Sequence, residues 1–388
     1  MTAPELEETP DISQSAEPHR QEEQALQAEP EPSIPPRERI LPLRSYCSHV
    51  GGSGCTRCAA VCPHGAVSVS AEDGPRIDAD ACTRCGLCMG VCDAFASLRI
   101  TLADLYERCL RHAQEGGPLV FTCNDHVFPG LDPHPNVIVL PCLASVPPEF
   151  WTALLAQGIT VGIHCDRTYC ETCTVAGPQA AALFRHALKT AQSWSGREIT
   201  IAEEIPERGT VLEMYTESEE LDRRGIFARA AREGMDIASG AHRRRNSGTV
   251  NGFHEQRERM RAEGRVRTST GPSLAAHTSG VNPPLMWPRQ ELLTKALQAN
   301  PLRAPKIERY VAVTDEALCE GSGICADVCP THARQKDPET GAVTLDQRYC
   351  IACGCCIANC PAGACDFEQT TALSLIEHLL AESEEPHA

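Results

Sequence analysis

Cysteines are the residues of this chain with the clearest capacity for chemistry, because most of the 23 fall in short runs of regular spacing. One run has the pattern C-x2-C-x2-C-x3-C and contains Cys82, Cys85, Cys88 and Cys92. Three thiolates on one tight loop can hold three corners of an iron–sulfur cubane, while the fourth reaches a neighbouring cluster. The spacing therefore predicts 4Fe-4S clusters held in pairs that exchange ligands.

A second run, just upstream, supplies the partner with an altered first position. Residues 55–63 have the spacing C-x2-C-x3-C-P, but the position three before them holds Gly52. The nearest earlier cysteine is Cys47, which we interpret as the displaced first ligand. Exchange of ligands then predicts a first complete set, the Cys47 set, of Cys47, Cys55, Cys58 and Cys92. The second, the Cys82 set, consists of Cys62, Cys82, Cys85 and Cys88.

The same pair of runs returns near the C-terminus with one thiolate missing, because the second position of the first run is Ser322. The complete set, the Cys350 set, contains Cys329, Cys350, Cys353 and Cys356. The incomplete one, the Cys319 set, contains Cys319, Cys325 and Cys360. It could hold a 3Fe-4S cluster, or a 4Fe-4S cluster with the Ser322 oxygen, water or a substrate on the odd iron. We favour the three-iron cluster, because such iron prefers a soft thiolate to a hard alkoxide.

Both ends of the chain, about 44–100 and 310–367, resemble the two-cluster bacterial ferredoxin family. Strand patterns at 66–69, 75–78 and 342–345, beside Gly and Asp-Gly turns, match the short hairpin of that family. The first unit departs from it where Asp93, and not proline, follows Cys92. Zinc is the alternative, since paired C-x2-C spacings are also typical of zinc sites, but zinc needs two pairs of ligands and not triplets closed by C-P. The resemblance implies α+β modules that carry electrons.

The region between these modules alternates strand and helix patterns. Apolar runs at 119–122, 137–140, 159–163 and 198–202 predict a small parallel α/β sheet, with helices at 148–157 and 177–192. The first three strands are followed at once by Cys123, Cys142 and Cys165, with Cys170 and Cys173 in the third loop. The carboxyl ends of parallel strands share one edge, so we expect these thiolates to meet there. A helix at 101–113 places Cys109 on its apolar face, as a buried residue and not a ligand.

The stretches 136–144 and 158–170 resemble the small iron–sulfur subunit that links hydrogenase to heterodisulfide reductase in methanogens. They read NVIVLPCLA and GITVGIHCDRTYC, with a C-x4-C pair at the end of the second. Three features depart from that family: His164 before Cys165, Ala144-Ser145, and a single cysteine near position 123. The resemblance implies a 2Fe-2S cluster on Cys123, Cys142, Cys165 and Cys170, with Cys173 as a fifth candidate. The alternative is a redox-inert or disulfide-forming α/β domain.

The remaining cysteines and nearby histidines are assigned no ligand role. Cys355 and Cys365 are surplus to the spacing. The histidines close to the cysteine loops are His49, His64 and His332, but every ligand set except the one at Ser322 is already complete. The sequence therefore predicts three 4Fe-4S clusters, one 3Fe-4S or serine- or water-ligated 4Fe-4S cluster, and one candidate 2Fe-2S cluster.

Composition sets the expected domain organisation and location. We expect a disordered acidic tail at 1–43, ferredoxin-like domains at 44–100 and 307–370, the α/β domain at 101–206, a basic linker at 207–306, and a C-terminal helix and tail at 371–388. The arginine-rich linker is a solvated connection or a cationic strap on the protein's own acidic units or an acidic partner. A net charge of −17 favours cationic partners and disfavours nucleic acid. Without a secretory signal or an apolar run of 18 residues, we expect a cytoplasmic protein with no membrane span.

No nucleotide-binding glycine motif, P-loop, zincin motif or nucleophile elbow occurs in the chain. The sequence therefore predicts an electron-transfer subunit of a cytoplasmic oxidoreductase complex, whose catalytic partner contains flavin, molybdenum or nickel. Electrons would pass from one ferredoxin pair through the middle domain to the other. The alternatives are an enzyme with an open-iron catalytic cluster and an iron–sulfur cluster assembly factor.

Overall fold

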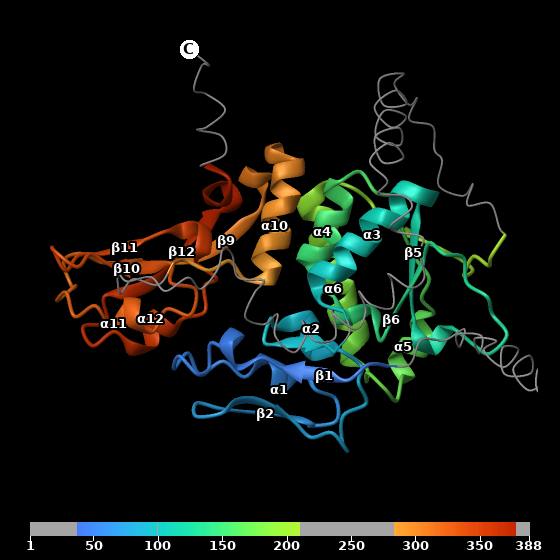
Figure 1. Cartoon of the computed structure of the whole chain (residues 1–388), viewed down its shortest axis with the longest axis horizontal. Coiled ribbons are helices and arrows are strands. Elements are labelled where there is room, and N and C mark those ends of the chain that lie inside the picture. The colour runs from blue at the N-terminus through green and yellow to red at the C-terminus, as the bar shows by residue number, and fades with distance from the viewer. Residues whose placement is uncertain (1–36, 99, 210–282, 378–388) are drawn as a thin grey trace, which may run out of the picture.

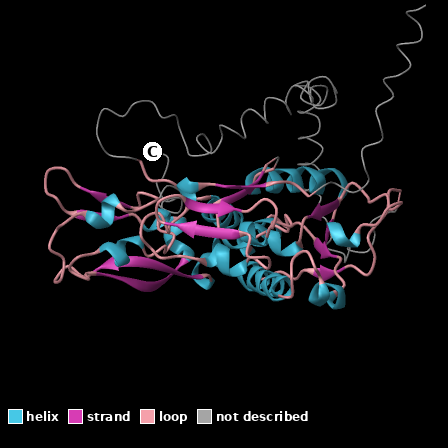
Figure 2. Ribbon diagram, turned by 90° about the horizontal axis from the view of Figure 1, so that it is seen from below, coloured by secondary structure: helices cyan, strands magenta, loops and turns pink. Residues whose placement is uncertain are grey.

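The computed structural model describes residues 37–98, 100–209 and 283–377. Most of the predicted acidic tail and basic linker, and the chain after residue 377, lie outside the described residues. The described part is elongated, with the C-terminal unit at one end, the central sheet at the other, and the N-terminal unit beside both (Figure 1). Figure 2 shows the longer helices gathered toward the central domain. No helix within these described ranges is long and apolar enough to cross a bilayer.

The N-terminal unit consists of two short antiparallel strand pairs and short helices that follow its cysteine loops. Its strands are β1 (Ile40–Pro42) paired with β4 (Phe95–Ser97), and β2 (Val67–Ser70) paired with β3 (Gly74–Ile77). Its helices are η1 (Arg44–Tyr46), α1 (Arg57–Val61) and α2 (Leu87–Val91). The predicted hairpin is confirmed, and the unit begins at β1, within the segment assigned to the tail.

The C-terminal unit repeats this arrangement in the same order. Its strands are β9 (Glu308–Thr314) paired with β12 (Cys365–Thr371), and β10 (Arg334–Lys336) paired with β11 (Val343–Leu345), all antiparallel. Its helical segments are α11 (Ile324–Asp327), η6 (Gln347–Tyr349), α12 (Cys355–Asn359) and η7 (Ala372–Leu375). Each unit thus places one short helix after each of its two cysteine loops.

The central domain contains a four-stranded parallel sheet in the order β6-β5-β7-β8, which confirms the predicted α/β sheet. The strands are β5 (Leu119–Cys123), β6 (Val137–Leu140), β7 (Val161–Ile163) and β8 (Thr200–Ile201). The helical segments are α3 (Leu102–Gly116), η2 (Asn124–His126), η3 (Leu143–Ser145), α4 (Pro148–Ala156), α5 (Arg167–Thr172) and α6 (Gln179–Ser195). A capping box of Thr101 and Asp104 begins α3.

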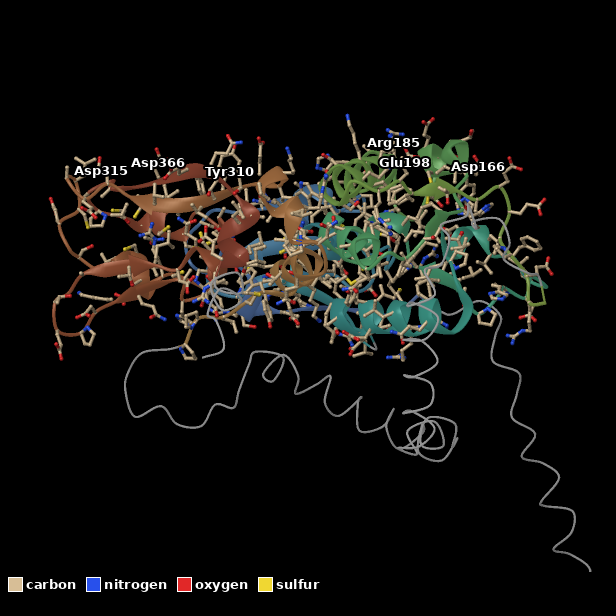
Figure 3. The ribbon with its side chains drawn as sticks, turned by 90° about the horizontal axis from the view of Figure 1, so that it is seen from above. Asp166, Arg185, Glu198, Tyr310, Asp315 and Asp366 are labelled. Atoms are coloured by element: carbon tan, nitrogen blue, oxygen red, sulfur yellow. The ribbon has the colours of Figure 1, made fainter. Side chains whose placement is uncertain are left out.

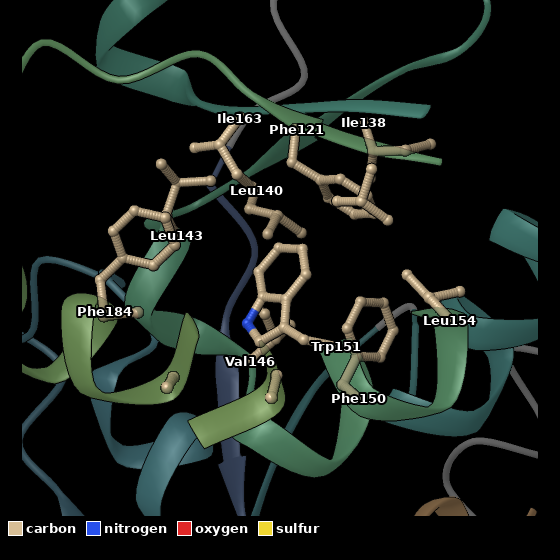
Figure 4. Close-up of a cluster of buried hydrophobic side chains, with 14 of the residues drawn as sticks. Phe121, Ile138, Leu140, Leu143, Val146, Phe150, Trp151, Leu154, Ile163 and Phe184 are labelled. Carbon is tan, nitrogen blue, oxygen red and sulfur yellow. The ribbon is translucent and has the colours of Figure 1, made fainter. Parts of the chain in front are cut away.

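Aromatic side chains fill the core between this sheet and α4. Phe121 of β5 meets Trp151 edge-on, with ring centroids 4.8 Å apart, and Phe150 at 6.2 Å. Figure 4 shows Trp151 facing side chains of the sheet, with Phe184 of α6 on one side of it and Phe150 on the other. Cys109 is fully buried in the same core, as predicted. The face of the sheet toward α4 therefore has a close-packed core.

The end of the segment predicted as linker is ordered helix. Helix α10 (Pro288–Ala299) packs against α4 and buries Leu292 and Ala296 in the central core, and η5 (Pro301–Lys306) follows it. Its Arg289 makes a two-pronged ion pair with Glu149 of α4, at 3.1 and 3.2 Å. The backbone N–H of Arg289 also donates to the carboxylate of Asp93 in the N-terminal unit. Helix α10 thereby joins the C-terminal unit to the other two parts.

Candidate iron–sulfur sites

The thiols of the Cys47 set are neighbours in the fold, although Cys47 stands eight residues before Cys55. Burial raises the pKa of Cys58, and the nearby thiols of Cys47 and Cys55 raise it further. Burial raises the pKa of Cys92 to about 12, and the thiols of Cys58 and Cys55 add to the effect. The backbone N–H of Ala94 donates to Cys92 Sγ at 3.4 Å. The chain therefore brings all four predicted ligands together, including the displaced one.

The Cys82 set is also gathered by the fold. Burial raises the pKa of Cys88, and the Cys85, Cys82 and Cys62 thiols raise it further. Cys62 reaches this set from the C-terminal end of α1, as ligand exchange requires. Thiols must lose their protons to bind iron, so assembly of a cluster here would release the protons that burial retains.

In the C-terminal unit, the Cys350 set comes together in the same way. Burial raises the pKa of Cys356, which also interacts with the thiols of Cys353 and Cys350. The surplus thiol of Cys355 hydrogen-bonds with Cys353 and interacts with Cys356 and Cys329. Cys329, Cys350 and Cys356 also share one buried hydrophobic cluster. The four predicted ligands thus lie around one position, with Cys355 beside them.

The cysteine loops at the complete and incomplete sites share one backbone feature. The residue before the second ligand position is left-handed in all four runs, with φ of 67° at Gly54, 60° at Arg84, 71° at Gly321 and 51° at Ala352. A non-glycine residue rarely adopts this conformation, and such strain concentrates at functional sites. Ser322 therefore occupies the position of a cysteine in a loop that keeps its ligand-binding shape.

The Cys319 set is open to solvent where its thiolate is missing. Ser322 and Cys319 are exposed, whereas Cys325 is buried. The surplus Cys365 is buried in the core beside Cys325 and hydrogen-bonds with Cys360. The structure therefore places Cys325, Cys360 and Cys365 together, with Cys319 and Ser322 on the surface loop.

A buried arginine lies between the two thiol sets of the C-terminal unit, and sequence spacing alone did not single it out. Arg334 is 3% exposed, and its guanidinium donates to the carbonyl of Ala312 and the hydroxyl of Thr314, both at 2.5 Å. Burial lowers its pKa, but the thiols of Cys356, Cys365 and Cys325 outweigh that effect. The equivalent position of the N-terminal unit, five residues after the fourth cysteine, holds Val67.

We expect Arg334→Gln to lower the reduction potentials of clusters in the C-terminal unit, because a buried cation stabilises the more negative, reduced state. The measurement is a potentiometric titration followed by paramagnetic resonance. Exposed Lys336→Gln is the control, and its potentials should remain close to those of the unaltered protein. Unchanged potentials in Arg334→Gln would rule out this electrostatic role.

In the central domain, four thiols converge at the carboxyl edge of the sheet, as strand order predicted. Burial raises the pKa of Cys142, and the thiols of Cys123, Cys85 and Cys170 raise it further. Cys165 Sγ and Cys170 Sγ lie 3.2 Å apart, and their hydrogen bond lowers the pKa of Cys170 to about 7. Cys173 lies to the side, 3.8 Å from the carboxylate of Asp125. Cys123, Cys142, Cys165 and Cys170 therefore form one group, the central set.

His126 is the member of this site that the sequence analysis missed. Its Nε2 accepts the backbone N–H of Asp166 at 3.0 Å, so the ring proton of the neutral imidazole lies on Nδ1. Nδ1 is 2.9 Å from Cys123 Sγ and donates to it. Burial lowers the pKa of His126, which favours this neutral form. The sequence did contain one indication of this role: His126 stands three residues after Cys123, which lies at the end of a predicted strand.

The loop inserted between Cys47 and Cys55 forms the contact between the two ferredoxin units. Cys355 Sγ donates to the carbonyl of Ser48 at 3.2 Å, and Asn359 Nδ2 donates to the carbonyl of Gly51 at 2.9 Å. We call these contacts the inter-unit contact. It brings the loop between Cys47 and Cys55 against α12, the helix that contains Cys356 of the Cys350 set. The expected order, with the central domain between the two units, does not match this arrangement.

A second contact joins the N-terminal unit to the central domain. A Cβ on Gly90 of α2 would overlap the carbonyl oxygen of Ala144 in η3, so glycine alone permits this approach. Thr83 Oγ1 donates to the carbonyl of Val175 at 2.7 Å. The thiol of Cys85 lies close enough to interact with Cys142. The Cys82 set and the central set are therefore direct neighbours.

The donor chemistry of the four-thiol sets fits iron–sulfur clusters. Among the residues that the structure describes, no three Cys, His, Asp or Glu side chains converge tightly enough to hold one metal ion. A zinc ion needs four donors at about 2.0–2.3 Å from one point. A cubane presents its iron corners to thiolates that stand around it, as the four-thiol sets do.

Comparison with known proteins supports this chemistry. Residues 53–96 and 309–364 match the family described as a 4Fe-4S dicluster domain. Both ends of the chain are ferredoxin-type 4Fe-4S domains. A stretch of 37 residues is 46% identical to the polyferredoxin-like subunit of an aliphatic sulfonate oxidoreductase from Pyrococcus furiosus. That stretch covers 10% of this chain and 21% of the relative, so the match spans about a fifth of its length. No solved structure matches the chain.

Proposed function

We propose that this protein is an iron–sulfur electron-transfer subunit of an oxidoreductase complex. The observation that carries the proposal is that the thiol sets follow one another through the protein. Their order is the Cys319, Cys350, Cys47, Cys82 and central sets. Iron–sulfur clusters, when bound, take up and release single electrons. The chain's own part is to hold successive sets close together, because electron tunnelling slows steeply with distance.

Three kinds of connection along this row of thiol sets support their order. Within each ferredoxin unit, exchange of the fourth cysteine ties one set to the other. Between units, the Cys355–Ser48 and Asn359–Gly51 hydrogen bonds join the Cys350 set to the Cys47 set. Beyond the Cys82 set, the Cys85–Cys142 neighbourhood leads to the central set, for which we propose a 2Fe-2S cluster. The central domain would then be one end of the relay and not its middle.

The partner that we propose is a catalytic oxidoreductase subunit with flavin, molybdenum or nickel. The relative from Pyrococcus furiosus is itself named as a subunit of an oxidoreductase, which supports a role in such a complex. Because clusters exchange one electron at a time, two-electron substrate chemistry would take place on that partner. We propose a cytoplasmic location.

Anaerobic purification with iron and sulfide analysis and paramagnetic resonance tests the proposal. We expect several magnetically coupled, low-potential clusters that persist in the presence of a chelator. Cys142→Ala should lose the iron of one small cluster, whereas Cys109→Ala, a buried cysteine outside every set, should keep all iron. Transfer of iron to an apo-acceptor would favour an assembly factor, and a cluster signal altered by substrate would favour an enzyme.

Ser322→Cys is expected to convert the Cys319 site to a complete four-thiolate site. The loop backbone at Gly321 and Gly323, with φ of 71° and 78°, is left-handed at the same two positions as the loops of the Cys82 and Cys350 runs, so the new thiol should need no rearrangement. Paramagnetic resonance of the oxidised protein should lose its three-iron signal and gain a reducible 4Fe-4S signal. A three-iron signal that persists in the variant would contradict this expectation.

A further inference from the structure

We propose that the surface around Cys319 is the docking face for a redox partner whose own surface is cationic with an apolar centre. This inference rests on the proposed electron-transfer function and locates one end of the relay. It is carried by three separate features of the C-terminal unit: exposure of a ligand, apolar side chains and charge.

The first feature is the exposure of Cys319. All 23 cysteines lie within the described residues, and Cys319 is the only exposed one among them. A partner must approach a cluster closely to exchange electrons with it, because tunnelling falls off steeply with distance. Of the predicted ligands of this protein, Cys319 is therefore the one that a partner can approach most directly.

The second feature is a group of large apolar side chains that remain in solvent. Leu318 and Ile324, which stand beside Cys319 and Cys325 in the chain, are 53% and 36% exposed. Tyr310 and Phe367, on the paired strands β9 and β12 of the same unit, are 54% and 45% exposed. These four are among nine large apolar side chains exposed in the described residues. Exposed apolar groups rimmed by polar residues mark interaction sites.

The third feature is negative charge in the stretch of chain that contains Cys319. Between residues 315 and 341, the exposed charged residues are one lysine, Lys336, and six acids: Asp315, Glu316, Glu320, Asp327, Asp337 and Glu339. The remaining cation of this stretch, Arg334, is buried. Asp315, Asp366 and Tyr310 lie along one side of the unit in Figure 3. A positive partner would be attracted to this end and oriented on it.

The test uses the full-length protein with its clusters, reduced and mixed rapidly with cytochrome c as a cationic protein acceptor. The double variant Glu316→Lys/Glu320→Lys should slow this transfer on the order of tenfold at low salt. The control, Glu72→Lys/Glu198→Lys, makes the same change in net charge at exposed positions outside this face and should change the rate less than about twofold. Reduction of a small uncharged quinone should be the same in both variants.

Equal slowing by the two double variants would overturn the proposal, because net charge alone would then govern the encounter. If the paramagnetic signature of Glu316→Lys/Glu320→Lys differs from that of the unaltered protein, Glu339→Lys on the β10–β11 turn replaces it, with Glu198→Lys as its control. Leu318→Ser should slow transfer at high salt, where the charge effect is screened. A purified protein without iron and acid-labile sulfide would instead refute the electron-transfer function, before any docking is measured.

Discussion

Replacing Gly90 with valine is expected to separate the N-terminal ferredoxin unit from the central domain. Gly90 is buried in α2, and even a Cβ there would overlap the backbone carbonyl oxygen of Ala144. Overpacking of this kind costs about 1–3 kcal/mol, and more where the neighbour cannot move. We therefore expect a lower melting temperature and loss of the magnetic interaction between the Cys82 set and the central set.

The matched control for this substitution lies in the C-terminal unit. Ala358 of α12 occupies the helix position equivalent to Gly90, two residues after the third cysteine of its run, but it is exposed. Ala358→Val should therefore leave both stability and cluster coupling unchanged. If Gly90→Val has the same melting temperature and the same magnetic coupling as Ala358→Val, the α2–η3 contact does not hold the N-terminal unit against the central domain.

Replacing Gly51 with valine is expected to open the inter-unit contact while leaving each ferredoxin unit intact. A Cβ at Gly51 would lie 2.9 Å from Cys355 Sγ and 3.3 Å from the carbonyl oxygen of Val328. The hydrogen bond from Asn359 to the Gly51 carbonyl should be lost with the displacement, at a cost of about 0.5–1.5 kcal/mol. Iron content should stay the same, but magnetic interaction between the Cys47 and Cys350 sets should weaken.

Two further variants make this experiment specific. Asn359→Ala removes the hydrogen-bond donor without adding bulk. It should therefore weaken the magnetic interaction between the Cys47 and Cys350 sets less than Gly51→Val does. Ser48→Ala is the control, because the Ser48 backbone carbonyl, and not its hydroxyl, accepts from Cys355. If magnetic coupling between the Cys47 and Cys350 sets stays complete in Gly51→Val, the distance between the two units does not depend on this contact.

Cysteine spacing predicted the local ligand sets because the constraint is local. A C-x2-C-x2-C loop has only a few conformations that direct three thiols to one point, so the Cys82 run could be assigned without coordinates. Ligand exchange then predicted Cys62 and Cys92 as fourth ligands, and each of these thiols lies near other thiols of its predicted set. The central set was predicted for a similar reason, since the ends of parallel strands must meet at one edge.

The arrangement of the sets relative to one another was not predictable from spacing. It depends on contacts between residues about 300 positions apart, such as Ser48 with Cys355 and Gly51 with Asn359. The inserted loop was interpreted only as a displacement of Cys47, because nothing in its sequence indicates what it touches. Arg334 was missed for the same reason: its importance comes from the two thiol sets on either side of it.

The inter-unit contact also has a consequence for how the protein is made. Residues 48–52 leave the ribosome about 300 residues before their partners in α12, so the N-terminal unit must exist for a time with Gly51 and Gly52 uncovered. Cluster insertion into that unit can precede synthesis of the rest of the chain, and continuity of the relay is completed only when Cys355 and Asn359 arrive. The C-terminal unit, which is synthesised last, is therefore the one that completes the inter-unit contact.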